Sequence, residues 1–155
     1  MSKNNKLIAI INSETDPEKL HNWIRNARKQ QADDVEQVAI QRLIEINALT
    51  NHDDPNDPLV LDFWKSITAL EFALSDERGK TIRLTRTRQK ISRVGVKKTL
   101  EDLAVSAKAS DGYFLLRDRG MLDMSAEAVV LRHPALFDDE IIKAAQSRLD
   151  ANSDD

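Results

Sequence analysis

The sequence predicts an all-α fold: a multi-helical single compact domain with an N-terminal helical hairpin, a central apolar helix and several short C-terminal helices. Apolar residues recur at helical spacings of three and four over most of the 155 residues. Only four Gly and four Pro are present, too few for the many turns of an all-β sandwich. Cysteine is absent, which excludes disulfides and thiolate metal sites.

Residues 1–50 are predicted to form the helical hairpin. The apolar run Leu7–Ile11 is too short to assign by its period, and we favour a helix because helical signals follow at once. The segment Thr15–Glu18 matches a capping box that opens a helix to about residue 30. Asp33 or Asp34 caps a second helix, which carries a wide apolar stripe to about residue 49. Because a short turn joins these two helices, they should pack antiparallel.

Residues 51–58 are predicted to form a linker, because Pro, Asn and Asp dominate this segment. A metal site here would use His52, Asp53, Asp54 and Asp57, but it would lack the alternating ligands and the central Gly of a calcium loop. We therefore predict no metal. Asp57 instead suits an N-cap ahead of Pro58.

The main helical domain, residues 59–150, should begin with the most apolar helix of the chain. This helix runs from Leu59 to about Arg78 and should end at Gly79. Glu71 projects within its apolar face, and the nearest explanation is a salt bridge or hydrogen bond to an arginine.

Short helices are predicted for the C-terminal part. Their expected N-caps are Thr99 for a helix to about residue 107, Ser110 or Asp111 for Tyr113–Arg119, Ser125 for Ala126–Arg132, and Asp138 for the last helix. Strands remain alternatives at 113–116 and 128–131. The polar, acidic tail at 151–155 is expected to be disordered.

Charge is distributed very unevenly along the chain. The stretch Arg78–Lys98 holds nine Lys or Arg and no Asp or Glu, whereas the remaining residues carry 14 basic and 26 acidic side chains. On a helix that is expected to stop at Gly95, one face would carry Arg83, Arg86, Lys90 and Arg93, and the adjacent face would carry Leu84, Thr87, Ile91 and Val94. Lys97 would extend the row of cations only if the helix continued past Gly95. Such a row of like charges needs an opposite partner, either carboxylates of a protein or an external polyanion.

We therefore predict a non-enzymatic, nucleic-acid-binding protein that contacts the phosphate backbone, most simply that of duplex DNA. Arginine suits this role because its planar guanidinium meets phosphate oxygens in a bidentate way. The alternative is a helical protein–protein interaction or homodimerisation module, whose basic helix pairs with acidic surfaces. The residues predicted to contact phosphate are Arg83, Arg86, Arg88, Lys90, Arg93, Lys97 and Lys98.

A second, looser DNA-binding pattern follows the basic stretch. Two short helices joined by a turn have the rhythm of a helix-turn-helix, and the second would offer Arg117 and Arg119. Asp111 and Asp118 would face phosphates badly, and the turn lacks a central Gly. Aromatic residues are few, which argues against base stacking on a single strand.

Catalytic patterns are absent from the sequence. His21, His52 and His133 are dispersed, and neither a glycine-rich phosphate loop nor a nucleophile motif is present. We predict no enzymatic activity and no cofactor. The N-terminal apolar run is too short for a signal peptide or a membrane span, so the expected location is cytoplasmic, without a membrane partner.

Overall fold

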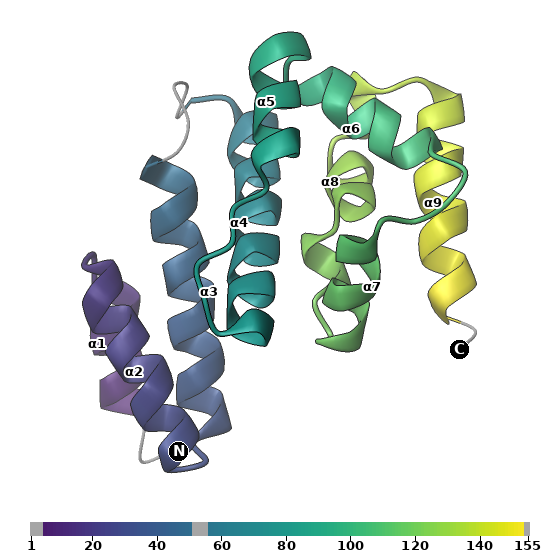
Figure 1. Ribbon diagram of the computed structural model, residues 1–155. Helices are drawn as coiled ribbons and strands as arrows, with labels where there is room; N and C mark the ends of the chain where they lie inside the picture. Colours follow the sequence, from purple (N-terminus) through teal and green to yellow (C-terminus); the bar gives the residue numbers. More distant parts are fainter. Residues whose placement is uncertain (1–4, 51–55, 154–155) are drawn as a thin grey trace. The chain divides into compact units, whose positions relative to one another are not determined.

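The computed structural model describes residues 5–50 and 56–153, and these form nine α-helices and two short 3-10 helices without any strand (Figure 1). The predicted all-α class is confirmed, and both segments with a strand alternative are helical. The chain divides into two compact units, residues 1–51 and 52–155. Residues 51–55 of the predicted linker and residues 154–155 of the predicted tail lie outside the described residues.

The first unit contains three helices, α1 (Asn5–Ser13), α2 (Pro17–Lys29) and α3 (Asp33–Thr50). Helices α2 and α3 pack against each other as the expected hairpin, and α1 packs on α3 (Figure 1). Leu20 and Leu43 are fully or almost fully buried in this unit. One detail of the prediction is wrong: the N-cap of α2 is Asp16, whose carboxylate accepts from the Glu18 amide at 3.0 Å, and not Thr15.

The second unit is built on a long central helix. Its helices are α4 (Pro58–Arg78), α5 (Thr85–Val94), α6 (Val96–Val105), α7 (Asp111–Asp118), α8 (Ala126–Arg132) and α9 (Asp139–Ser153), with 3-10 turns η1 (Leu122–Met124) and η2 (Pro134–Leu136). Helix α4 packs against α6, α7 and α8, while α8 also packs against α9 (Figure 1). Phe63 and Ile67 of α4 are buried, as expected for the most apolar helix.

Several helix ends follow from short polar side chains and glycines. The Asp57 carboxylate accepts from the Leu59 amide at 2.9 Å, and Ser110 and Ser125 cap α7 and α8 in the same way. Gly79 ends α4 in the left-handed conformation, with φ of 67°. These N-caps and this helix end were predicted from the sequence.

Two boundaries differ from the prediction. Helix α6 begins at Val96 and not after Thr99, because Gly95 at φ of 90° both ends α5 and begins α6, leaving no loop between them. Thr99 is buried inside α6, and its hydroxyl donates to the Gly95 carbonyl at 2.8 Å. Helix α9 continues to Ser153, so the backbone at 151–153 is helical where we expected a disordered tail.

A buried charge pair holds α9 to the rest of the second unit. Arg148 of α9 donates to Glu127 of α8 and to the Leu103 carbonyl of α6, both at 2.9 Å. Tyr113 of α7 in turn donates its hydroxyl to the Arg148 carbonyl at 3.1 Å. Removing one partner of such a buried pair leaves an uncompensated charge, so these contacts tie four helices together.

Asp62 of α4 forms a second link, to the end of α8. Its carboxylate accepts from Arg132 at 2.8 Å and lies 2.9 Å from the His133 ring. Burial would raise the pKa of Asp62, but the hydrogen bonds and charges of Arg132 and His133 outweigh it, and the pKa is lowered from its ordinary 3.8. The folded state thus favours the ionised carboxylate.

We predict that Asp62→Asn destabilises the protein in a pH-dependent way. A lowered pKa stabilises the folded state above the unfolded value and loses that contribution as pH falls through the folded value. At pH 7 the variant should be less stable by about 1.5–3 kcal/mol, the size of hydrogen bonds to a charged group. Urea unfolding should show this difference shrinking below about pH 4. A difference that stays constant from pH 7 to pH 3 would contradict the assignment.

Candidate nucleic-acid interface

The basic stretch 78–98 is divided among three helices. Arg78 ends α4, residues 79–84 form a connecting segment, Arg86 to Arg93 lie on α5, and Lys97 and Lys98 lie in the first turn of α6. The predicted basic helix is therefore wrong at its start, because Arg83 lies outside it, whereas its predicted end at Gly95 is confirmed. Arg83 precedes α5, whose N-cap position is Leu84, and Gly95 separates the two lysines from the α5 face.

The position of α5 depends on Glu71 of α4. One Glu71 oxygen accepts from the Leu84 amide at 2.8 Å and from Arg88 Nε at 2.7 Å, while the other accepts from Arg88 Nη2 at 2.6 Å. The Arg88 guanidinium also lies 5.1 Å from the centre of the Trp64 ring. The predicted pairing of Glu71 with an arginine is confirmed, and the Glu71 hydrogen bonds raise the pKa of Arg88 above its already high value.

No residue of α5 is buried, so apolar packing contributes little to holding this helix. The connecting segment is instead fixed by hydrogen bonds to α4. The Ser75 hydroxyl accepts from the Ile82 amide at 2.8 Å, and Glu71 holds the Leu84 amide two residues later. Both contacts place Arg83 and the start of α5 over the C-terminal half of α4.

Three of the predicted lysines pair with acids of α6. Lys90 lies 2.6 Å and Lys98 3.1 Å from Asp102, and Lys97 lies 4.0 Å from Glu101. Hydrogen bonds from Lys90 and Lys98 lower the pKa of Asp102. Because the side chains of Lys97 and Lys98 are more than half exposed, their pairs are weak and exchange easily with another anion.

The remaining predicted residues, Arg83, Arg86 and Arg93, are exposed, and none forms an ion pair with a described carboxylate. Arg78 shares this property, although we did not include it in the predicted site. Eight of the twelve arginines have a side-chain partner inside the described part of the chain, and the four without one all lie between positions 78 and 93. The sequence did offer a signal for Arg78, because this residue belongs to the stretch 78–98, which contains no Asp or Glu.

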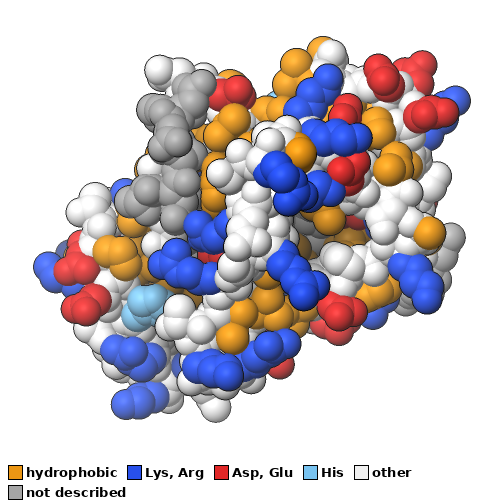
Figure 2. Space-filling view, turned by 45° about the horizontal axis from the view of Figure 1, so that its top comes forward, with side chains coloured by type: hydrophobic (Ala, Val, Ile, Leu, Met, Phe, Trp, Pro, Cys, Tyr) orange, Lys and Arg blue, Asp and Glu red, His pale blue; other side chains and the backbone are white. Residues whose placement is uncertain are grey.

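The exposed arginines do not belong to a continuous basic field. On the face drawn in Figure 2, Lys and Arg side chains are interspersed with Asp, Glu and apolar side chains. Pairing within the second unit neutralises Arg88 and Lys90, and it leaves separate cations around them. The surface can therefore make a few discrete anion contacts.

The looser helix-turn-helix hypothesis fits the structure poorly. Arg119 pairs with Asp76 of α4 at 3.1 Å and is compensated within the second unit, while Arg117 of α7 forms an exposed, weak pair with its neighbour Asp118 at 3.2 Å. Gly112 brings α7 close to α4, since a Cβ added there would lie 2.4 Å from a Leu70 methyl. Helix α7 thus packs into the unit and does not project from it.

Within residues 5–50 and 56–153, no three His, Asp or Glu side chains are grouped as metal ligands would be. Over the same residues, every helix is too short or too polar to span a lipid bilayer. No protein-family model, curated protein or solved structure matches the chain significantly.

We predict that Glu71→Gln releases α5 from α4. The amide keeps the side-chain shape but loses the charge that holds Arg88 and the Leu84 amide. Native-state hydrogen exchange should show the Leu84 amide and the amides of α5 opening at least about tenfold more often, since hydrogen bonds to a charged group contribute about 1.5–3 kcal/mol.

Glu101→Gln is the matched control, because its 4.0 Å contact with the exposed Lys97 is weak. It should leave exchange in α5 unchanged. Equal exchange at Leu84 in Glu71→Gln and in the unmodified protein would show that Glu71 does not hold the helix.

Proposed function

We propose that the protein binds the phosphate backbone of nucleic acid, with duplex DNA as the simplest ligand, through Arg78, Arg83, Arg86 and Arg93. The single observation that carries the proposal is that these four arginines have no side-chain partner among the described residues. Of the other eight arginines, seven pair with a carboxylate, and Arg25 donates to the side-chain oxygen of Asn22. A protein with 26 acidic residues has ample means to pair them. Because these arginines are unpaired and lie in one short segment, they are available to bind an external anion.

The chemistry of these side chains supports a phosphate ligand. A guanidinium is always charged and offers a planar set of donors that matches phosphate oxygens. Arg86 and Arg93 are seven residues apart on α5, close to two full turns, so they share one side of the helix. The exposed Lys97 and Lys98 lie next along the chain and add weaker, exchangeable contacts.

The acidic residues of the chain limit how extensively a polyanion can bind. The net charge is −3 and the acidic remainder of the chain repels a polyanion, which favours a shallow contact of a few phosphates over a deep wrap. Backbone contacts position a protein without reading bases, so we expect little sequence preference. The paired Arg88 and Lys90 support the interface by fixing α5 and do not need to touch phosphate.

The test is a salt titration of binding to a fluorescently labelled duplex. Four phosphate contacts predict a slope of about −3 to −4 in a plot of log affinity against log salt. The variant Arg83→Gln, Arg86→Gln, Arg93→Gln should retain the fold, because these side chains are exposed. It should bind at least about tenfold more weakly, with a slope reduced in magnitude by about 3.

A control with the same change in net charge separates a local site from general electrostatics. Lys19→Gln, Lys29→Gln, Lys143→Gln removes three exposed cations from α2 and α9. It should keep most of the affinity and the slope. Equal losses in the two triple variants would contradict the proposed interface. No binding at low salt would leave the protein-interaction or dimerisation module as the remaining proposal.

A further inference from the structure

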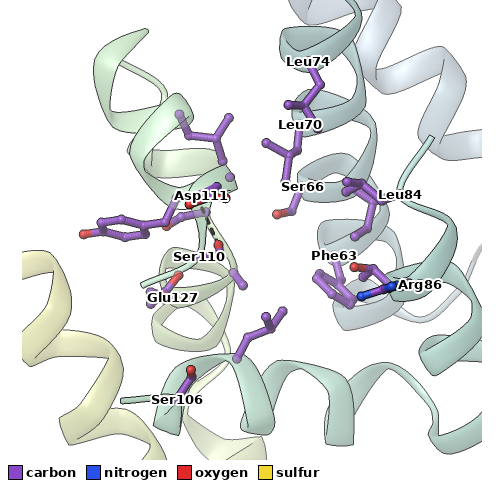
Figure 3. Close-up of a pocket in the computed structure, with 18 of the residues that line it drawn as sticks. Phe63, Ser66, Leu70, Leu74, Leu84, Arg86, Ser106, Ser110, Asp111 and Glu127 are labelled. Atoms are coloured by element: carbon purple, nitrogen blue, oxygen red, sulfur yellow. Dashed lines mark hydrogen bonds between the residues drawn. The ribbon is translucent and has the colours of Figure 1, made fainter. Parts of the chain in front are cut away.

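A cavity of about 600 Å³ lies within the second unit (Figure 3). Its walls come from five helices, α4, α5, α6, α7 and α8, with part of the segment that leads into α5. The volume falls in the range of small-molecule pockets, about 300–1,000 Å³. Enclosure by five elements gives a concave site and not a flat surface patch.

The inner walls are mostly apolar. Phe63 forms part of the wall, and four leucines that line the cavity are only half-buried, although they are large apolar side chains of a folded unit: Leu70, Leu74, Leu84 and Leu103. Figure 3 shows Leu70 and Ser66 of α4 on one side of the open space, and Ser110, Asp111 and Glu127 on the other. Apolar surface is thus left without a covering side chain on several walls at once.

Cations border this apolar space. Arg78, Arg86 and Lys108 line the cavity, all three are exposed, and none forms an ion pair with a described carboxylate. Among the acids that line it, Glu127 is already paired with Arg148, which leaves Asp111. The free side chains around the cavity therefore carry a net positive charge.

We propose that this cavity binds a small amphiphilic anion, a molecule with an apolar chain or ring and a single carboxylate, sulfonate or phosphate group. The apolar part would cover the half-buried leucines, and the anionic group would meet Arg86 with Arg78 or Lys108. Burial of an alkyl chain against these leucines removes apolar surface from water and favours binding in proportion to the length of the chain. A neutral ligand would leave the cations unused, and a cationic one would be repelled.

Isothermal titration calorimetry with decanoate, below the concentration at which it forms micelles, tests the proposal. Decanoate should bind with a stoichiometry of one. Acetate has the same head group without the chain, and decyltrimethylammonium has the same chain with the opposite charge, so neither should bind measurably. The experiment contains no nucleic acid, so its outcome is independent of the proposed function.

Two variants separate the head-group site from the chain site. Arg86→Gln should weaken decanoate binding about tenfold, the effect of one charge-assisted hydrogen bond. Ala126→Phe adds bulk at a half-exposed position of the wall, and it should abolish binding while circular dichroism and the melting temperature stay close to those of the unmodified protein. Lys143→Gln on α9 matches the charge change of Arg86→Gln outside the cavity and should change nothing.

Four results would overturn the proposal. Three of them are the absence of decanoate binding, equal binding of decanoate and decyltrimethylammonium, and an Arg86→Gln affinity equal to that of the unmodified protein. The fourth is the binding of several decanoate molecules per chain, because a single cavity of this volume holds one.

Discussion

The carboxylate of Glu71 is the contact on which the basic segment depends. Its two oxygens accept three hydrogen bonds, from the Leu84 amide and from two nitrogens of Arg88. Most helices are held in place by an apolar face that packs on the core. Helix α5 has no buried residue, so hydrogen bonds to the Glu71 carboxylate hold it in place instead. It is half-buried, and a charge in that setting is stable only with such partners.

The cations of residues 78–98 form two groups, one that is paired with carboxylates and one that is exposed. Arg88 and Lys90 hold α5 to α4 and α6, and their charges are compensated within the second unit. Arg78, Arg83, Arg86 and Arg93 remain exposed, and their charges are not compensated by a described carboxylate. Arg78 and Arg86 belong both to this exposed group and to the lining of the cavity, so they connect the proposed phosphate contacts with the proposed ligand site.

Local signals in the sequence were enough for much of the fold, whereas long-range contacts decided the rest. The caps at Asp57, Ser110 and Ser125 act on neighbouring amides, so they could be predicted, and the isolated acid Glu71 indicated an arginine partner. The place of Arg83 outside α5 was missed because it depends on contacts from Glu71 and Ser75, up to 13 residues earlier in the chain. The cavity joins five helices, and no pattern in the sequence indicated that Lys108 and Arg86 would line the same cavity.

We propose that pairing divides the arginines of this segment into structural and ligand-binding sets. Side-chain Nε–Hε NMR spectra of the protein, recorded while a short DNA duplex is added, test it most directly. The signals of Arg78, Arg83, Arg86 and Arg93 should shift saturably, while those of Arg88, Arg119 and Arg148 should stay in place. Shifts at Arg88 as large as those at Arg86, or no shift at any of the exposed arginines, would contradict it.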